Sequence, residues 1–294
     1  MINLGVPAGL GAAASWALGT VLFKGVGETV EPLVLTAAKT LFSVFALGAF
    51  LLIFGWQPIT ASSLGWLVLS GLLGVAAGDT LFFAALRRLT VHQLVILMMV
   101  SPGVTIILAL IALGEKLSPI LWLGIILILV GITVGLLPGL RQSDQGSSDL
   151  RGLMFGCLAM VCMAVSVIVA KLGVVAVSAL EATFIRMLAG WVGVSSILVI
   201  QRRIATGLNS LATWRTALRF VLAATVVTFG GFWLTLVAIK WLEVSIANTL
   251  IATEPMFALP LAIFGLQERP KRLAWIGASI AFPGTLLIAF GHSS

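Results

Sequence analysis

The chain has 294 residues, of which 60% are hydrophobic and only 9% are charged. Because soluble domains carry about 25% charged residues, this composition excludes a soluble fold and indicates that lipid surrounds most of the chain. The net charge of +7 comes from Lys and Arg scattered between apolar segments. This pattern is typical of loops beside anionic lipid, and it excludes a nucleic-acid-binding surface.

Ten apolar runs follow one another along the chain. Each is close to the length of about 20 residues that crosses a hydrocarbon core of about 30 Å. Such a span must be helical, because its backbone groups find no water to bind. The runs lie at 4–24, 33–54, 64–86, 93–113, 119–138, 152–175, 180–200, 217–240, 245–266 and 272–290. They predict an all-α integral membrane protein with no room for a soluble domain.

A polar linker at residues 139–151 separates two halves, 1–138 and 152–294, which hold five runs each. A shift of 153 residues aligns the last two runs of the halves without a gap, pairing Pro102 with Pro255, Glu115 with Glu268, Trp122 with Trp275 and Gly131 with Gly284. Because five is odd, the second half enters the membrane from the opposite side. The sequence therefore predicts two inverted five-helix repeats, an architecture typical of secondary transporters with a substrate site near the midplane.

Two prolines and a carboxylate mark the middle of the predicted fourth and ninth helices. Pro102 and Pro255 are repeat mates, and proline removes a backbone hydrogen bond and kinks a helix. They are predicted to form a pair of hinges, with a static kink as the alternative. Glu254 precedes Pro255, and a carboxylate at this depth is costly and faces a cavity or a partner. Glu254 is the strongest candidate for substrate binding.

Three further charged residues inside the runs are candidates for substrate binding. Lys39 and Arg186 are repeat mates one or two turns inside the second and seventh helices. The alternative for both is snorkelling toward the headgroups. Asp79 lies about two turns before the end of the third helix. It is either a substrate ligand or a structural partner of Lys39 or Arg186.

The remaining candidates are polar or aromatic residues beside these charges. Trp16 and Trp233 lie in the middle of their helices, where an indole N–H favours a cavity, although lipid-facing positions are the alternative. Ser101 is the repeat mate of Glu254. The additional candidate substrate-binding residues are Trp16, Trp233, Phe83, Met99, Ser101 and Asn248.

Motifs of catalysis and metal binding are missing from the sequence. The chain has two histidines and no His-Glu-x-x-His, Gly-x-Ser-x-Gly or phosphate-loop pattern. The sequence therefore predicts no enzyme activity, no metal and no cofactor. The expected partners are a small-molecule substrate and membrane lipid, with proton coupling as an option, and the chain is expected to work as a monomer.

The predicted fourth helix ends in Leu113-Gly114-Glu115-Lys116, and the predicted ninth helix carries Thr253-Glu254-Pro255 and ends in Gln267-Glu268-Arg269. With the two five-helix halves, these residues resemble the EamA type of the drug/metabolite transporter superfamily. The resemblance covers essentially the whole chain and is greatest to aromatic amino acid exporters of the YddG type. It implies a ten-helix basket with a central cavity, alternating access, and export of aromatic and other neutral amino acids across a bacterial inner membrane. Since the chain has no Tyr, Trp and Phe would replace any cavity tyrosines of such exporters.

The sequence leaves two sets of alternatives. Lys and Arg are concentrated in loops after odd-numbered helices, which places both termini outside, whereas ten-helix relatives imply termini inside. A zwitterionic amino acid would offer its ammonium to Glu254 or Asp79 and its carboxylate to Lys39 or Arg186. The other functions considered are multidrug or organic-cation efflux by proton exchange, an intramembrane enzyme, and a receptor or scaffold.

Overall fold

The computed structural model describes residues 4–27, 30–86, 88, 100–142, 150–201, 214–254, 256–257 and 272–291. All regular elements within these ranges are helices. They are α1 (Gly5–Gly27), α2 (Pro32–Phe54), α3 (Ala61–Ser70), η1 (Gly71–Gly78), α4 (Asp79–Leu86), α6 (Val100–Ala112), α7 (Pro119–Gln142), α8 (Leu150–Val174), α9 (Ala179–Ile200), α10 (Trp214–Thr225), η4 (Val226–Trp233), α11 (Leu234–Trp241), α12 (Val244–Ile251) and α14 (Arg272–Gly291).

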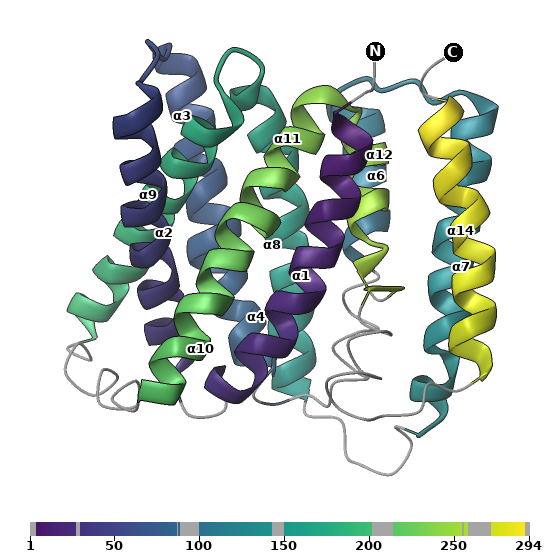
Figure 1. Cartoon of the computed structure of the whole chain (residues 1–294), viewed down its shortest axis with the longest axis horizontal. Coiled ribbons are helices and arrows are strands. Elements are labelled where there is room, and N and C mark those ends of the chain that lie inside the picture. Colours follow the sequence, from purple (N-terminus) through teal and green to yellow (C-terminus); the bar gives the residue numbers. More distant parts are fainter. Residues whose placement is uncertain are drawn as a thin grey trace.

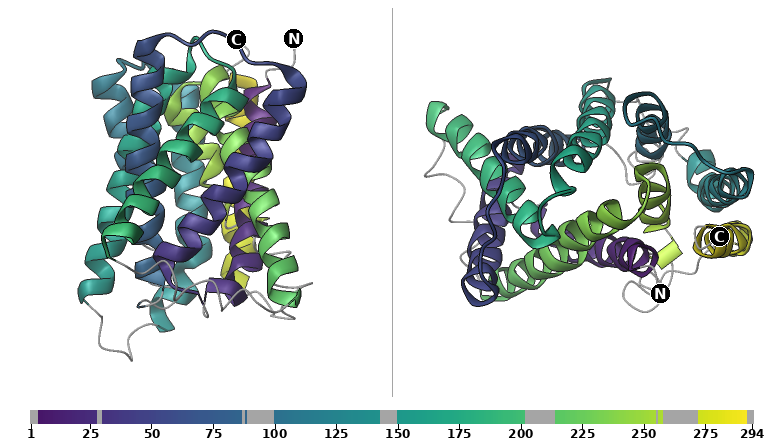
Figure 2. Two further views of the ribbon diagram at one scale, coloured as in Figure 1. Left: turned by 90° about the vertical axis from the view of Figure 1, so that its left-hand side faces the viewer. Right: turned by 90° about the horizontal axis from the view of Figure 1, so that it is seen from above.

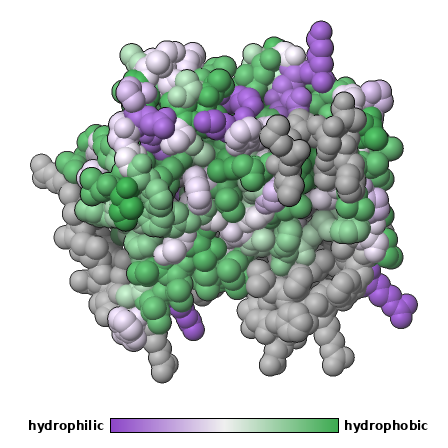
Figure 3. Space-filling view, turned by 45° about the horizontal axis from the view of Figure 1, so that its top comes forward, coloured by the Kyte–Doolittle hydropathy of each residue, from purple (hydrophilic) through white to green (hydrophobic). Residues whose placement is uncertain are grey.

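Six of the described helical segments are long and apolar enough to cross a membrane. They are 5–23, 32–54, 61–85, 150–174, 179–200 and 216–241, and shorter apolar helices lie at 101–112, 119–131 and 279–288. Large apolar side chains point outward along them: Leu52 is 89% exposed and Ile200 is 80% exposed. Figure 3 shows such side chains spread over the flank of the bundle, with hydrophilic ones gathered toward the end where α1 begins. Lipid is the solvent that suits this surface.

The helices stand side by side, and α1 begins at the same end of the bundle at which α14 ends (Figure 1). α8 packs against α3, η1 and α4, whereas α1 packs against α10, η4 and α11. α2 packs against α9 at the side of the bundle away from α7 and α14 (Figure 1). α7 and α14 pack against each other at one edge of the bundle, as the right-hand view in Figure 2 shows.

The spans 61–86 and 214–241 each contain a π-helical segment in the middle. η1 and η4 are eight residues long each, and their i→i+5 bonds widen the turn. The widened turns place Asp79 directly after η1 and put Thr228 and Phe232 within η4. Such segments are frequent at functional sites. Hydrophobic patterning predicted plain helices here, because an apolar run reads the same in either geometry.

The predicted ninth helix, 245–266, is not continuous. α12 ends at Ile251, and Ala252 and Thr253 form a turn before Glu254. Proline at position 255 supplies no N–H for the carbonyl of Ile251, which removes one helical bond there. The interruption falls beside Pro255, where the sequence predicted a hinge or a static kink in this helix.

The contact between α7 and α14 brings two backbones together. A Cβ placed on Gly131 would lie 2.6 Å from the backbone nitrogen of Ala281 and 2.6 Å from the carbonyl oxygen of Gly277. A Cβ on Gly284 would lie 2.7 Å from the carbonyl oxygen of Gly124. Small residues at these positions are what membrane helices need for such close approach.

Replacing Gly131 by leucine is expected to destabilise the protein by about 1–3 kcal/mol. The added side chain meets backbone atoms of α14, which cannot move aside as a flexible side chain does. Thermal unfolding of the purified protein in detergent measures the loss. Gly65→Ala is the matched control, because a Cβ on Gly65 meets nothing within 4 Å. An unchanged unfolding temperature in Gly131→Leu would contradict the close contact.

Candidate functional site

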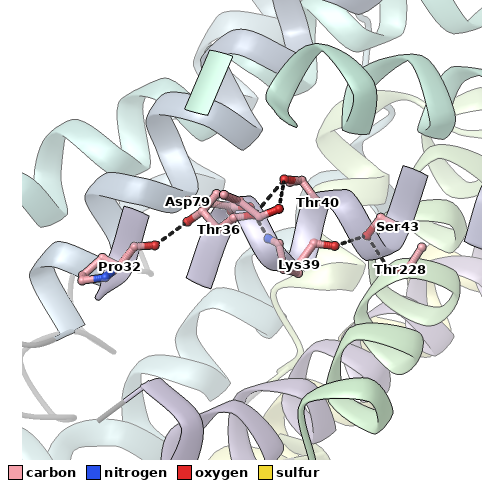
Figure 4. Close-up of polar contacts among 8 residues, drawn as sticks. Pro32, Thr36, Lys39, Thr40, Ser43, Asp79 and Thr228 are labelled. Carbon is pink, nitrogen blue, oxygen red and sulfur yellow. Dashed lines mark hydrogen bonds and ion pairs between the residues drawn. The ribbon is translucent and has the colours of Figure 1, made fainter. Parts of the chain in front are cut away.

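Lys39 and Asp79 form a buried ion pair. Lys39 lies two turns inside α2, Asp79 is the first residue of α4, and the Lys39 Nζ donates to Asp79 Oδ2. Their side chains are 3% and 10% exposed, and Figure 4 shows them pointing toward one another. Lys39 therefore does not snorkel to the headgroups. The sequence left Asp79 either as a substrate ligand or as a structural partner of Lys39 or Arg186, and the structure pairs it with Lys39.

Aromatic rings flank the Lys39 ammonium. Its Nζ lies 4.8 Å from the ring centroid of Phe232 in η4 and 5.8 Å from that of Phe83 in α4. The faces of both rings carry negative charge density that stabilises a cation. The structure thus brings the predicted site residue Phe83 to the ion pair.

Hydroxyl groups along α2 fix the helix around Lys39. Thr36 Oγ1 donates to Pro32 O at 2.9 Å, and Ser43 Oγ donates to Lys39 O at 2.9 Å. Ser43 Oγ also lies 2.7 Å from Thr228 Oγ1 of η4, so α2 is tied to η4 one turn beyond Lys39 (Figure 4). These bonds satisfy hydroxyls that hydrocarbon would leave unpaired.

Trp16 of α1 completes an aromatic wall. Its ring packs edge to face on Phe232, with centroids 4.7 Å apart and an interplanar angle of 75°, and its Nε1 donates to Thr235 Oγ1 at 3.4 Å. The half-buried Trp16 ring thus packs on η4, and its N–H has a partner on α11. Trp233 is half-buried and leaves η4 in a different direction from Phe232. The ring contacts described for the chain do not include it.

Glu254 lies where the regular helix has ended. Thr253 N donates to Leu250 O at 3.1 Å and Met256 N donates to Thr253 O at 2.8 Å, which are the short i→i−3 bonds of a tightened turn. The half-buried Glu254 accepts from Thr20 Oγ1 at 3.2 Å. Thr20 is four residues after Trp16 on α1, so the two share one helix face. Glu254 is thus placed next to the aromatic wall.

Arg186 is buried between α9 and α8. It is 4% exposed, and its Nη2 donates to Ser166 Oγ of α8 at 3.1 Å. Ser166 is also paired with Ser70 of α3, with the two Oγ atoms 3.0 Å apart. Snorkelling is therefore excluded for Arg186, as it is for Lys39. Arg186 and Asp79 both adjoin η1, because a Cβ on Gly74 would lie 3.4 Å from Arg186 Nη2 and Asp79 directly follows Gly78.

The other predicted residues are not joined to this cluster by the described side-chain contacts. Ser101 and the buried Pro102 lie in the first turn of α6, and Asn248 is half-buried in α12. Met99 and Pro255 lie outside the described residues. Sequence reasoning missed Thr20, Ser166, Thr228 and Thr235. Their signal was faint: each is a small polar residue in an apolar helix, a type that often hydrogen-bonds between membrane helices.

The C-terminal ends of α8 and α11, together with Glu115, line a cavity of about 640 Å³. Lys171 Nζ donates to the carbonyls of Ile239 and Leu242 at 2.7 and 2.8 Å. Lys240 Nζ donates to Val177 O at 2.7 Å. These lysines satisfy carbonyls at helix ends, where unpaired acceptors gather. They tie the helix ends together at this face of the bundle.

Glu115 caps the beginning of α12. Its carboxylate accepts from Val244 N at 2.5 Å, from Ser245 N at 3.1 Å and from Ser245 Oγ at 2.6 Å. A carboxylate suits this place because helix N-termini carry unpaired N–H groups and partial positive charge. The glutamate of the loop motif thus fixes the entry of the helix that leads to Glu254.

Replacing Glu115 by alanine is expected to lower stability by about 1–3 kcal/mol, because the N–H groups of Val244 and Ser245 lose a charged acceptor. Thermal unfolding in detergent measures the change. Lys116→Ala is the matched control, since the neighbouring Lys116 is exposed. Equal unfolding temperatures for the two variants would contradict a capping role.

The fold and site define a multi-pass helical membrane protein with charged and aromatic groups buried between its helices. Among the described residues no group of three His, Cys, Asp or Glu side chains is placed to hold a metal. The model of the EamA-like transporter family matches residues 3–137 and 150–290. The chain therefore belongs to the EamA-like transporter family.

Two individual proteins add to this. The uncharacterized transporter YwfM of Bacillus subtilis (strain 168) is 33% identical over 135 residues, a match that spans 44% of this chain and 44% of YwfM. A solved crystal structure, described only as that of a protein, aligns with a TM-score of 0.74 over 100% of this chain and 99% of its own, at 17% identity. At that identity the likeness shows a shared fold and nothing further.

Proposed function

We propose that the chain is a secondary transporter that exports small metabolites, with aromatic and other neutral amino acids as the favoured substrates. The observation that carries the proposal is the cluster formed by the buried Lys39, Asp79 and Phe232 with the half-buried Trp16 and Glu254. It combines both charge signs with an aromatic wall, and its residues come from α1, α2, α4, η4 and the end of α12. A zwitterion with an aromatic side chain matches these three chemistries.

Alternating access between two inverted five-helix halves is the proposed mechanism. The proposed architecture has ten membrane crossings: the six long segments, α6, α7, α14 and the span that begins with α12. Packing supports the inversion: Ser166 of α8 faces Gly74 of η1, as Ser15 of α1 faces Gly230 of η4. The family model matches once in each half. An even number of crossings also agrees with α1 beginning and α14 ending at the same end (Figure 1).

In this mechanism the substrate binds between the halves near the midplane. Its ammonium pairs with Glu254, and its side chain packs on Trp16 and Phe232. Pro102 and Pro255 act as hinges that let the fourth and ninth helices bend. The lysine ties of Lys171 and Lys240 hold one face of the bundle closed. The transporter is proposed to reside in a bacterial inner membrane and to function as a monomer.

A competing function is efflux of organic cations by proton exchange. The placement of Glu254 beside an aromatic wall favours it, because carboxylates and aromatic faces both attract cations. The two functions differ in their need for a buried cation: a cation pump needs Glu254 but has no use for a positive charge at the site.

Flux in proteoliposomes separates the two. The purified protein is reconstituted into vesicles. The vesicles are loaded with labelled amino acids, nucleosides or organic cations, and flux is measured with and without a pH gradient. The proposal expects flux of phenylalanine, tryptophan and other neutral amino acids above that of protein-free vesicles. Flux of an organic cation with no flux of any amino acid would overturn it. Dependence on the pH gradient tests proton coupling.

A further inference from the structure

Arg186 is a buried cation without a matching carboxylate among the described residues. Its Nη2 donates to the neutral Ser166 Oγ at 3.1 Å, and its Nε–H is buried with no acceptor in the described part of the chain. A guanidinium presents five N–H donors in a fixed fork. A charge in an apolar interior is expensive unless it is paired. The arrangement is therefore short of one anionic acceptor.

The nearby carboxylates are already engaged. Asp79 binds the Lys39 ammonium. Glu181, five residues before Arg186 in α9, accepts from Gln57 N at 2.6 Å and from Ser178 Oγ at 2.7 Å in the cap of its own helix. From Leu150 to Trp241 the sequence contains no acidic residue other than Glu181. The sequence from Leu150 to Trp241 thus contains no carboxylate left to pair with its buried arginine.

The predicted repeat mates Lys39 and Arg186 have different partners. Lys39 has an aspartate and two aromatic faces, whereas Arg186 has one serine hydroxyl. Around Asp79 the charges are two cations and one anion, so a single negative charge completes the set. A dianion, such as a phosphate ester, would exceed it.

Room for a guanidinium in this place comes from glycines of η1. Gly71 lies against the backbone of Arg186, and a Cβ on Gly74 would lie 3.4 Å from Arg186 Nη2. The widened turn of η1 and these two glycines therefore let the side chain of Arg186 extend from α9, past η1, to Ser166 of α8. Planar, bidentate binding of carboxylates is the chemistry for which arginine is suited best.

We propose that Arg186 binds the anionic group of the transported molecule, and that this group is a carboxylate or another single negative charge. The inference rests on the proposed transport function and assigns the substrate class of the same site. Lys39 is then a structural cation held by Asp79, and Arg186 is the specificity-determining one.

The test compares phenylalanine, which has a carboxylate, with phenylalaninol, which keeps the ammonium and ring but lacks it. N-acetylphenylalanine, an anion without an ammonium, is the third substrate. Wild-type protein in proteoliposomes is expected to move phenylalanine in preference to phenylalaninol. Arg186→Gln is expected to lose about tenfold or more of the phenylalanine flux, the worth of a charged hydrogen bond, with little change for phenylalaninol. Arg186→Lys keeps the charge and should retain part of the preference.

Binding of benzoate, a plain monocarboxylate, gives a readout that needs neither transport nor an ammonium group. Benzoate is expected to raise the unfolding temperature of wild-type protein and not that of Arg186→Gln, and the unfolding temperature without ligand reports whether the variant folds. If Arg186→Gln does not fold, Arg186→Lys carries the comparison, with benzoate stabilising it less than wild type.

The outcomes separate the two proposals. Arg186-dependent flux of N-acetylphenylalanine without flux of phenylalanine would overturn the amino acid proposal and support the anion site. Phenylalanine flux that keeps its preference over phenylalaninol in Arg186→Gln would overturn the anion site and leave amino acid export standing. Flux of phenylalaninol alone in wild type, or equal stabilisation of wild type and both variants by benzoate, would also overturn the anion site.

Discussion

Glu254→Gln is expected to lower the flux of the preferred substrate by about tenfold or more, the loss that follows when a charged hydrogen-bond partner becomes neutral. The carboxylate lies where α12 has ended and beside the aromatic wall on α1. Glutamine keeps the shape and the acceptor for Thr20 Oγ1 but removes the charge that attracts an ammonium. Initial rates in proteoliposomes, normalised to the amount of folded protein, measure the effect.

Thr20→Val is the matched control for that substitution. It removes the neutral donor to Glu254, whose hydrogen bond is 3.2 Å long, and leaves the carboxylate charged. A smaller loss than in Glu254→Gln is therefore expected. Flux at the wild-type rate in Glu254→Gln, with correct folding, would remove Glu254 from the site. Equal losses in the two variants would indicate that geometry, and not charge, is what matters there.

Asp79→Asn is expected to destabilise the protein by about 3–5 kcal/mol, the usual cost of leaving one partner of a buried ion pair charged and alone. Lys39 is 2% exposed overall, so water cannot replace the lost carboxylate. The cation–π contacts with Phe83 and Phe232 remain but are weaker than an ion pair. Denaturant titration in detergent micelles, followed by tryptophan fluorescence, measures the difference.

The double variant Lys39→Met, Asp79→Leu distinguishes a lost pair from a disturbed fold. Replacing a buried ion pair by apolar residues of similar size is often neutral or stabilising. The double variant is therefore expected within about 1 kcal/mol of wild type or above it. If Asp79→Asn matches wild type, or if the double variant is as unstable as the single one, the ion pair is not what holds α2 to α4.

Much of the fold follows from the sequence because the bilayer sets the length of each run. The predicted runs 33–54 and 180–200 correspond to α2 at Pro32–Phe54 and α9 at Ala179–Ile200. The widened turns of η1 and η4 escaped prediction, because their residues are mainly apolar and hydropathy carries no information on which backbone bonds form. The turn before Glu254 is different, because it lies next to Pro255, where the sequence did predict a bend.

The site was predictable to the extent that it is charged. Lys39, Asp79 and Arg186 stand out in an apolar chain, and the structure buries all three, with Lys39 paired to Asp79. Which cation Asp79 would choose did not follow from the sequence, because the depth of a residue along a helix says nothing about the face it occupies. Thr20 and Ser166 were missed for a related reason: a single hydroxyl in hydrocarbon is common, and its partner on another helix decides its role.

The backbone contact between α7 and α14 has a mechanical consequence. Side chains that interdigitate can slide past one another by changing rotamers, but two backbones at the distances found around Gly131 and Gly284 have no rotamers to change. α7 and α14 therefore form a rigid helix pair at the edge of the bundle (Figure 2). In the proposed mechanism each of its helices belongs to a different half, so a swing of one half against the other is anchored at this helix pair. The largest displacements are then expected in the helices farthest from it.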